Sequence, residues 1–281
     1  DSDKHTTIRQ SFLKEAEILS KIKSPYIVKV LEDFEANGTY YFVMEYLEGI
    51  TLLEFLNSNH HKISEQSALF IIYNIAINVL YLHDNNIMHL DLKPSNIICK
   101  NEEYCALIDF GISLFFENKE KIMKNVHIAG GSLHYAPIEQ LKGNVDVKFT
   151  PTMDIYAIGA ILFNLLTGKT PPMSEVFLHK GFPYDDFIKL GINKDIIKFN
   201  SWLMDVEPLN RPQSIWEIIF ELHRLLSIAS DTPIKNNHYE ENSSTADFNF
   251  NDTLEMRNGL SIQWSNICEQ HQKKTDPLHN R

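Results

Sequence analysis

Apolar positions change their spacing along the chain, and this spacing predicts where helices and strands lie. Residues 12–22 place apolar side chains at helical intervals up to a break at Ser24-Pro25, which predicts an amphipathic helix. Residues 27–31 and 40–46 alternate around Asn37-Gly38, a pair typical of hairpin turns, so they are predicted to be paired strands. The first 46 residues are therefore expected to combine one helix with a small β-rich part.

The chain beyond residue 47 has mainly helical spacing. Thr51 to Glu54 matches a capping box that opens a short helix, and Ser64 is placed to cap a long apolar helix. Two more apolar helices are predicted over 154–168 and 215–226, the first with a glycine stop followed by prolines. A mostly helical unit is therefore expected here.

Two short strands interrupt this helical region. Residues 97–99 and 105–108 are rich in strand-forming side chains and are joined across 101–103, which predicts a hairpin. Because the two strands are antiparallel, Asn96 before the first and Asp109 after the second are expected to lie near each other.

Composition and charge narrow the class of protein. With 281 residues, 43% of them hydrophobic, the chain can bury a large core. Its net charge of −11 argues against a nucleic-acid binder, and three cysteines without a C-x-x-C pair fit a reducing cytoplasm. The apolar stretch 68–82 contains two asparagines and is shorter than a membrane span, so it is expected to be a buried helix.

Candidate chemistry is concentrated in two motifs. The first is His89-Leu90-Asp91-Leu92-Lys93-Pro94-Ser95-Asn96, and Asp109-Phe110-Gly111 begins thirteen positions after it. Each residue of the two motifs, taken singly, could be an ordinary turn or capping residue. Both motifs together at this spacing are rarely found by chance. A carboxylate and an amide oxygen at the ends of one hairpin suit Mg²⁺.

The first motif closely resembles the catalytic loop of the protein kinase family, H-R-D-L-K-P-x-N, with Leu90 in place of the arginine. The resemblance implies a bilobal α+β fold with a truncated small β-rich lobe over 1–46 and a large, mainly helical lobe over 47–229. Residues 230–281 are polar and are expected to form a flexible tail.

The resemblance also implies roles in ATP-dependent phosphoryl transfer to serine or threonine hydroxyls of protein substrates. Asp91 is expected to accept the substrate proton, Lys93 to steady the transferring charge, and Asn96 with Asp109 to hold Mg²⁺. Lys93 and Ser132 indicate the serine/threonine subclass. The expected nucleotide-binding residues are Met44, Glu45, Leu47, Ile98, Ile108 and Asp109.

Other family positions are expected to be structural or regulatory. Asp154 is expected to anchor the catalytic loop, Ser132 to contact it, and Glu139 to pair with Arg211. The segment around Glu139 has the form Tyr-Ala-Pro-x-Glu-Gln, which resembles some bacterial-type kinases. The remaining expected members of this set are Glu15, which would pair with a strand lysine, and the motif residues His89, Phe110 and Gly111.

Two departures from the family pattern carry expectations of their own. Leu90 cannot bind an activation-segment phosphate, so activity without phosphorylation of that segment is expected. No glycine-rich loop or strand lysine precedes Glu15, where only 14 residues are available, and Lys4 is too close to serve. The chain is therefore expected to bind ATP poorly by itself and to expose a sheet edge with apolar side chains.

Two alternatives to an active protein kinase remain at this stage. A pseudokinase or scaffold is favoured by the missing lysine and disfavoured by the intact Asp91, Asn96 and Asp109. A kinase-like small-molecule phosphotransferase fits poorly with the Ser132 to Glu139 segment and Arg211. The sequence thus favours a cytoplasmic protein kinase with no nucleic-acid partner and no membrane span, and it leaves the oligomeric state open.

Overall fold

The computed structural model describes residues 27–37, 39–58, 63–101, 104–110, 113–115, 132–141 and 149–231. All of these described residues belong to one compact unit. The predicted helix over 12–22 with Glu15, the motif glycine Gly111 and the predicted tail beyond 231 lie outside the described residues.

The predicted N-terminal hairpin is present. Strand β1 (Val30–Ala36) pairs antiparallel with β2 (Thr39–Met44), and Asn37 between them has the positive φ of 53° that this turn requires. The first strand begins at Val30 rather than at the predicted residue 27, because Ile27 instead forms an isolated parallel bridge with Leu107.

This hairpin is a two-stranded sheet with apolar side chains in solvent among the described residues. The exposed fraction reaches 59% for Leu31 and 47% for Met44. An isolated hairpin is marginal in water, and apolar side chains on it are available for contact with another element. The expected exposure of apolar surface on this sheet is therefore confirmed. The other exposed apolar side chains on it are Phe34, Tyr41 and Val43.

Two capped helices follow the short strand β3 (Ile50–Thr51). The predicted capping box opens α2 (Leu52–Ser58), because Thr51 N donates to Glu54 Oε2 at 2.8 Å and Glu54 N donates to Thr51 Oγ1 at 3.1 Å. Ser64 Oγ likewise accepts from Ser67 N at 2.9 Å and caps α3 (Glu65–Asp84). Both predicted caps are confirmed.

Helix α3 is the central apolar helix of the described part. It has 20 residues, so it is longer than the predicted stretch 68–82, and by length and composition alone it could cross a membrane. However, 72% of its apolar window is buried within the fold. Helix α3 is therefore apolar because it packs in the core of the fold.

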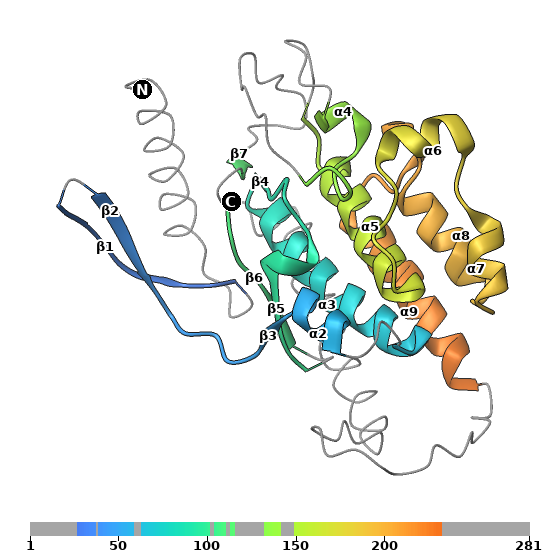
Figure 1. The fold of residues 1–281 in the computed structure, drawn as a ribbon, viewed down its shortest axis with the longest axis horizontal. Helices are drawn as coiled ribbons and strands as arrows, with labels where there is room; N and C mark the ends of the chain where they lie inside the picture. Colours follow the sequence, from blue (N-terminus) through green and yellow to red (C-terminus); the bar gives the residue numbers. More distant parts are fainter. Residues whose placement is uncertain are drawn as a thin grey trace, which may run out of the picture. The chain divides into compact units, whose positions relative to one another are not determined.

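A three-stranded sheet with the order β3-β5-β6 lies against α3 (Figure 1). Strands β5 (Ile97–Asn101) and β6 (Tyr104–Leu107) form the second predicted hairpin, and Ile108 N donates to Asn96 O at 3.0 Å. The ladder thus extends to the pair next to Asp109, as predicted. The 3-10 turn η1 (Pro94–Asn96) leads into this hairpin, while β4 (Ile87–Met88) pairs with β7 (Leu114–Phe115).

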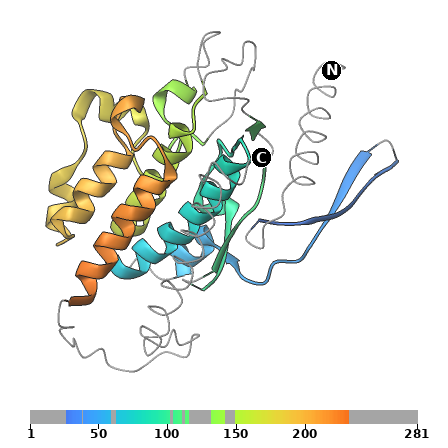
Figure 2. The same cartoon turned by 180° about the vertical axis from the view of Figure 1, so that it is seen from behind.

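Helix α5 (Thr152–Thr167) forms the centre of the helical part, and Figures 1 and 2 show it between neighbouring helices. It packs against α3 and α8 (Lys194–Leu203), while α9 (Ile215–Asp231) packs against α3. Gly168, with a φ of 66°, ends α5 as predicted. The remaining elements are α4 (Ile138–Leu141), α6 (Ser174–Lys180), α7 (Tyr184–Lys189) and η2 (Pro208–Asn210).

Close approach between α5 and the end of α8 requires a glycine. A Cβ atom on Gly159 would lie 2.7 Å from Leu203 Cβ and 2.7 Å from Met204 Cγ. Asn200 Nδ2 donates to Gly159 O at 2.7 Å across the same contact. The described chain is thus a mixed α+β fold in which a small strand-rich part accompanies a larger helical part built on α3 and α5.

Candidate active site

Asp154, in the first turn of α5, holds the loop that follows β4. Its carboxylate is fully buried and accepts from His89 N at 2.9 Å and from Leu90 N at 2.8 Å. It also bonds His83 Nε2 at 2.8 Å. Burial acts to raise the pKa of Asp154, but the hydrogen bonds from His83 and from the Leu90 N–H outweigh it, so the pKa lies below its ordinary value. The carboxylate therefore stays ionised and anchors the loop.

Leu90 has a strained backbone at the centre of this loop. Its φ of 65° lies in the left-handed region, which is costly for a bulky residue. The fold compensates by bonding both backbone polar groups, because Asp154 accepts from its N–H and Gln140 Nε2 donates to its carbonyl at 2.6 Å. The buried side chain of Leu90 lies where the resembled motif has an arginine.

The next residue, Asp91, has a carboxylate held by four hydrogen bonds. Lys93 Nζ donates to Oδ2 at 2.6 Å and Asn96 Nδ2 donates to the same oxygen at 3.1 Å. Ser132 donates to Oδ1 from both its N and its Oγ, each at 3.1 Å. The predicted contact between Ser132 and the loop is therefore present, and the carboxylate has a fixed orientation.

Asn96 and Asp109 supply oxygen atoms of the kind that Mg²⁺ prefers. Asn96 Nδ2 donates to Asp91, which fixes the orientation of the amide and leaves Oδ1 as the acceptor. Ser95 Oγ donates to this Oδ1 at 3.3 Å. Asp109 is exposed and adopts a φ of 64°, which Asp tolerates better than most residues. In the described ranges no three His, Cys, Asp or Glu side chains form a metal cluster. Two such ligands fit Mg²⁺, which keeps waters and phosphate oxygens in its coordination shell.

His89 packs behind this loop. Its ring lies 4.8 Å from that of Phe110, and its carbonyl accepts from Ser113 Oγ at 3.1 Å. His89 Nε2 is buried without a partner among the described residues. Burial lowers the pKa of His89 below 6.5, although the nearby Asp154, Asp91 and Asp109 carboxylates act in the opposite direction. The ring is therefore a neutral packing group.

The lowered pKa of His89 predicts a pH effect on stability. Below pH 6.5 the unfolded chain binds a proton at His89 that the folded chain does not bind, so acidification destabilises the fold. His89→Phe keeps a ring against Phe110 and should flatten the slope of unfolding free energy against pH by up to about 1.4 kcal/mol per unit. Urea unfolding from about pH 7.5 to about pH 5.5 measures this slope. An unchanged slope would contradict a buried neutral ring.

The segment from Ser132 to α4 is held against the helical part. Tyr135 Oη donates to Asn164 Oδ1 at 2.9 Å, and His134 Nδ1 lies 2.8 Å from Pro171 O. Burial raises the pKa of Tyr135 to about 12, so its hydroxyl stays protonated and able to donate. The two ends of the segment both contact the loop, because Ser132 Oγ donates to Asp91 and Gln140 Nε2 donates to the Leu90 carbonyl. The segment and the loop therefore support each other.

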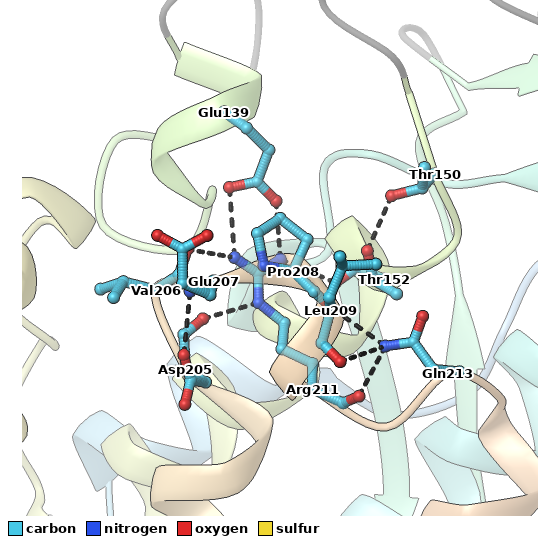
Figure 3. A network of polar contacts seen from close by, with 10 residues as sticks. All are labelled: Glu139, Thr150, Thr152, Asp205, Val206, Glu207, Pro208, Leu209, Arg211 and Gln213. Carbon is cyan, nitrogen blue, oxygen red and sulfur yellow. Dashed lines mark hydrogen bonds and ion pairs between the residues drawn. The ribbon is translucent and has the colours of Figure 1, made fainter.

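A buried ion pair fixes the end of this segment (Figure 3). Arg211 is fully buried and donates to Glu139 from two nitrogen atoms, at 2.6 and 3.1 Å, as predicted. The guanidinium also donates to the carbonyls of Asp205 at 2.7 Å, Thr152 at 3.1 Å and Val206 at 3.3 Å. Every donor direction thus has an acceptor, which offsets the cost of burying the charge.

The expected nucleotide-binding residues lie in two places. Ile98 and Ile108 are half-buried on or next to the β5–β6 hairpin. Met44 ends β2 with its side chain exposed, and Glu45 Oε1 accepts from Lys29 N at 3.0 Å. Leu47 follows in the connection to β3 and is half-buried. The roles of all five remain predictions.

Sequence reasoning assigned no role to several side chains that hold the site. Gln140 bonds Leu90 O, His83 bonds Asp154, and Asn78 Nδ2 donates to Cys105 O at 2.8 Å. The available signal for Asn78 was an amide inside an otherwise apolar helix, which a buried partner must satisfy. His83 and Gln140 had no comparable signal, because their partners are 50 or more residues away.

The described residues combine a strand-rich part with a larger helical part. The Asp91 carboxylate is held by its own loop and by Ser132, which is 41 positions away in the sequence. This arrangement is that of a protein-kinase-type fold. A family model described as the protein kinase domain matches residues 1–218, so this chain belongs to that family.

Several curated relatives are similar to this chain. It is 36% identical over 160 residues to the serine/threonine-protein kinase PrkC of Bacillus subtilis, covering 57% of this chain and 24% of that relative. It is 36% identical over 172 residues to the calcium-dependent protein kinase 4 of Plasmodium berghei, covering 60% and 31%. It is 27% identical over 220 residues to the serine/threonine-protein kinase cds1 of Schizosaccharomyces pombe, covering 75% and 46%. The chain thus spans less than half the length of these relatives.

Proposed function

We propose that this chain is the catalytic domain of a serine/threonine protein kinase, which transfers a phosphoryl group from ATP to hydroxyl groups of protein substrates. The observation that carries the proposal is the carboxylate of Asp91, held by Lys93, Asn96 and Ser132. A general base must have a fixed orientation toward the hydroxyl that it deprotonates. The names of the serine/threonine-protein kinases PrkC and cds1, to which this chain is similar, support the same substrate class.

Each residue of the site has a separate task in this proposal. Asp91 accepts the proton of the substrate hydroxyl at a carboxylate oxygen and orients the attacking oxygen. Lys93, whose Nζ lies 2.6 Å from Asp91 Oδ2, supplies positive charge beside the transfer path. Asn96 Oδ1 and the Asp109 carboxylate would hold Mg²⁺. ATP, when bound, would supply the phosphoryl group, and Mg²⁺ would neutralise charge on the ATP phosphates.

Nucleotide binding uses the residues between the two hairpins. The backbone of Met44 to Leu47 would bind the adenine, while Ile98 and Ile108 would line the floor and back of the nucleotide pocket. Both isoleucines are half-buried, and so have surface left for a ligand to cover. This part of the proposal rests on the family resemblance and on the exposure of these side chains.

A phosphotransfer assay on the natural full-length protein tests the proposal. Labelled ATP with Mg²⁺ is expected to label serine or threonine in casein-like proteins and to leave small alcohols and aminoglycosides unlabelled. Phosphoamino-acid analysis shows whether the label is on serine, threonine or tyrosine. Labelling of small alcohols alone would establish a small-molecule phosphotransferase instead.

A scaffold without phosphotransfer is the second candidate, favoured by the apolar side chains exposed on the β1–β2 sheet. Such surface is typical of a protein interaction site. The two candidates differ in nucleotide binding: a kinase is stabilised against heat by ATP with Mg²⁺, and a scaffold that does not bind ATP is not. Stabilisation without any phosphotransfer would favour an ATP-binding pseudokinase.

Activity should not depend on phosphorylation of the segment between Asp109 and Glu139. Leu90 offers no charge to a phosphate, and the hydroxyls of Ser113 and Ser132 already donate to His89 O and Asp91 Oδ1. Phosphatase treatment of the purified protein is therefore expected to change kcat by less than about twofold. A large loss that returns after incubation with ATP would contradict this expectation.

A further inference from the structure

Two of the three cysteines lie opposite each other in the sheet. Cys99 on β5 is paired in register with Cys105 on β6, and their Sγ atoms are 2.8 Å apart. Both side chains are buried, with exposed fractions of 5% and 0%, and neither sulfur is in a disulfide. The site described above uses neither side chain.

The register shows which type of antiparallel pair they form. Hydrogen-bonded and non-hydrogen-bonded pairs alternate along such a ladder. Ile108 N donates to Asn96 O, which makes these two residues a hydrogen-bonded pair. Cys99 and Cys105 are three pairs further along the same register, so they form a non-hydrogen-bonded pair.

Two independent contacts agree with this assignment. Carbonyls of a non-hydrogen-bonded pair point away from the partner strand. Cys105 O accepts from Asn78 Nδ2 of α3 at 2.8 Å. Cys99 O points to the neighbouring β3 side, where a Cβ on Gly49 would lie 2.6 Å from it. Both carbonyls are thus directed out of the β5–β6 hairpin.

This pair type suits a disulfide. Directly opposite Cα atoms in a non-hydrogen-bonded pair are about 4.5 Å apart. A disulfide accepts Cα separations of about 4.4–6.8 Å. The two cysteines are also on the same face of the hairpin, because residues in register point to one side. A bond between the sulfurs therefore needs no shift of register.

We propose that Cys99 and Cys105 are a reversible modification site, which a hydroperoxide oxidises to an intrachain disulfide. The Cys99 sulfur, as thiolate, attacks the peroxide oxygen, which gives a sulfenic acid and, with hydrogen peroxide, releases water. The Cys105 sulfur then attacks the sulfenic sulfur and displaces a second water. Two thiols and one hydrogen peroxide thus give one disulfide and two waters, and an alkyl hydroperoxide would give an alcohol in place of the first water. A small dithiol returns both thiols by exchange.

The bond would join the two strands that lead to Asn96 and Asp109. Ile98 points to the opposite face of β5 from Cys99, so the disulfide forms away from the side chain assigned to the nucleotide. Closing this short loop in the unfolded chain should raise the midpoint of thermal unfolding by about 5 °C. The modification is therefore expected to stabilise the hairpin without blocking the site.

Mass spectrometry of the natural full-length protein tests the proposal without an activity assay. After hydrogen peroxide treatment and alkylation, the non-reducing peptide map should contain a Cys99–Cys105 linked peptide, and dithiothreitol should remove it. The thermal midpoint should rise and fall with the linked peptide. Because no phosphotransfer is measured, this result is independent of the proposed function.

Three variants control the experiment. Cys268→Ala should keep the linked peptide, whereas Cys99→Ala and Cys105→Ala should lose it together with the thermal shift. Linkage through Cys268, oxygen addition without linkage, or reaction only in denaturant would each overturn the proposal. Even where a variant folds poorly, the non-reducing peptide map of the unsubstituted protein shows whether the Cys99–Cys105 linked peptide forms.

Discussion

Replacing Asp91 with asparagine should lower kcat for protein phosphorylation by about 10²–10⁴-fold, the usual contribution of a general base. The carboxylate oxygens accept from Lys93 Nζ, Asn96 Nδ2 and two donors of Ser132. An asparagine cannot take the substrate proton, and its amide places a donor against these donors. Steady-state kinetics of the purified variant measure the change, with a much smaller effect expected on the KM for ATP.

An exposed acid provides the matched control for this variant. Asp186 pairs with Lys189 on α7, where both side chains are mostly exposed. Asp186→Asn makes the same acid-to-amide change outside the site and should leave kcat within about twofold of the unsubstituted protein. If Asp91→Asn also keeps activity within about tenfold, Asp91 is not the base.

Replacing Arg211 with methionine should lower the free energy of unfolding by about 3–5 kcal/mol, because it breaks from one side a pair in which the arginine is buried and the Glu139 side chain is 19% exposed. The change leaves Glu139 without its partner and removes donors from the carbonyls of Asp205 and Thr152. Urea unfolding followed by circular dichroism measures the loss.

The exposed pair Arg224–Glu221 on α9 is the matched control for this prediction. Arg224 donates to Glu221 at 2.6 Å, but its side chain is 46% exposed. Arg224→Met should therefore cost no more than about 1 kcal/mol. The double variant Glu139→Leu/Arg211→Met should recover little, because the carbonyls that Arg211 satisfied remain unpaired. Equal losses for Arg211→Met and Arg224→Met would contradict the buried-pair interpretation.

Local elements could be predicted well from the sequence. The capping box at Thr51, the cap at Ser64 and the hairpin turn at Asn37 all depend on bonds between residues a few positions apart. Such bonds form wherever the local pattern occurs, so the pattern is sufficient evidence. The predicted ends of strands were less accurate. The first strand starts at Val30, because Ile27 instead bridges to Leu107, which is 80 positions away.

The sequence by itself determined the two motifs, their spacing and the hairpin that brings Asn96 toward Asp109. The tertiary structure decided how the loop of the first motif is held. Asp154 and Gln140 bond opposite sides of Leu90 across 64 and 50 positions, and the partner of each depends on how α3, α4 and α5 pack. The family resemblance named Asp154 and the Glu139–Arg211 pair, but nothing in the local pattern named Gln140 or His83. Most buried polar groups find partners, and in a packed interior the closest available partner is set by the fold rather than by sequence distance.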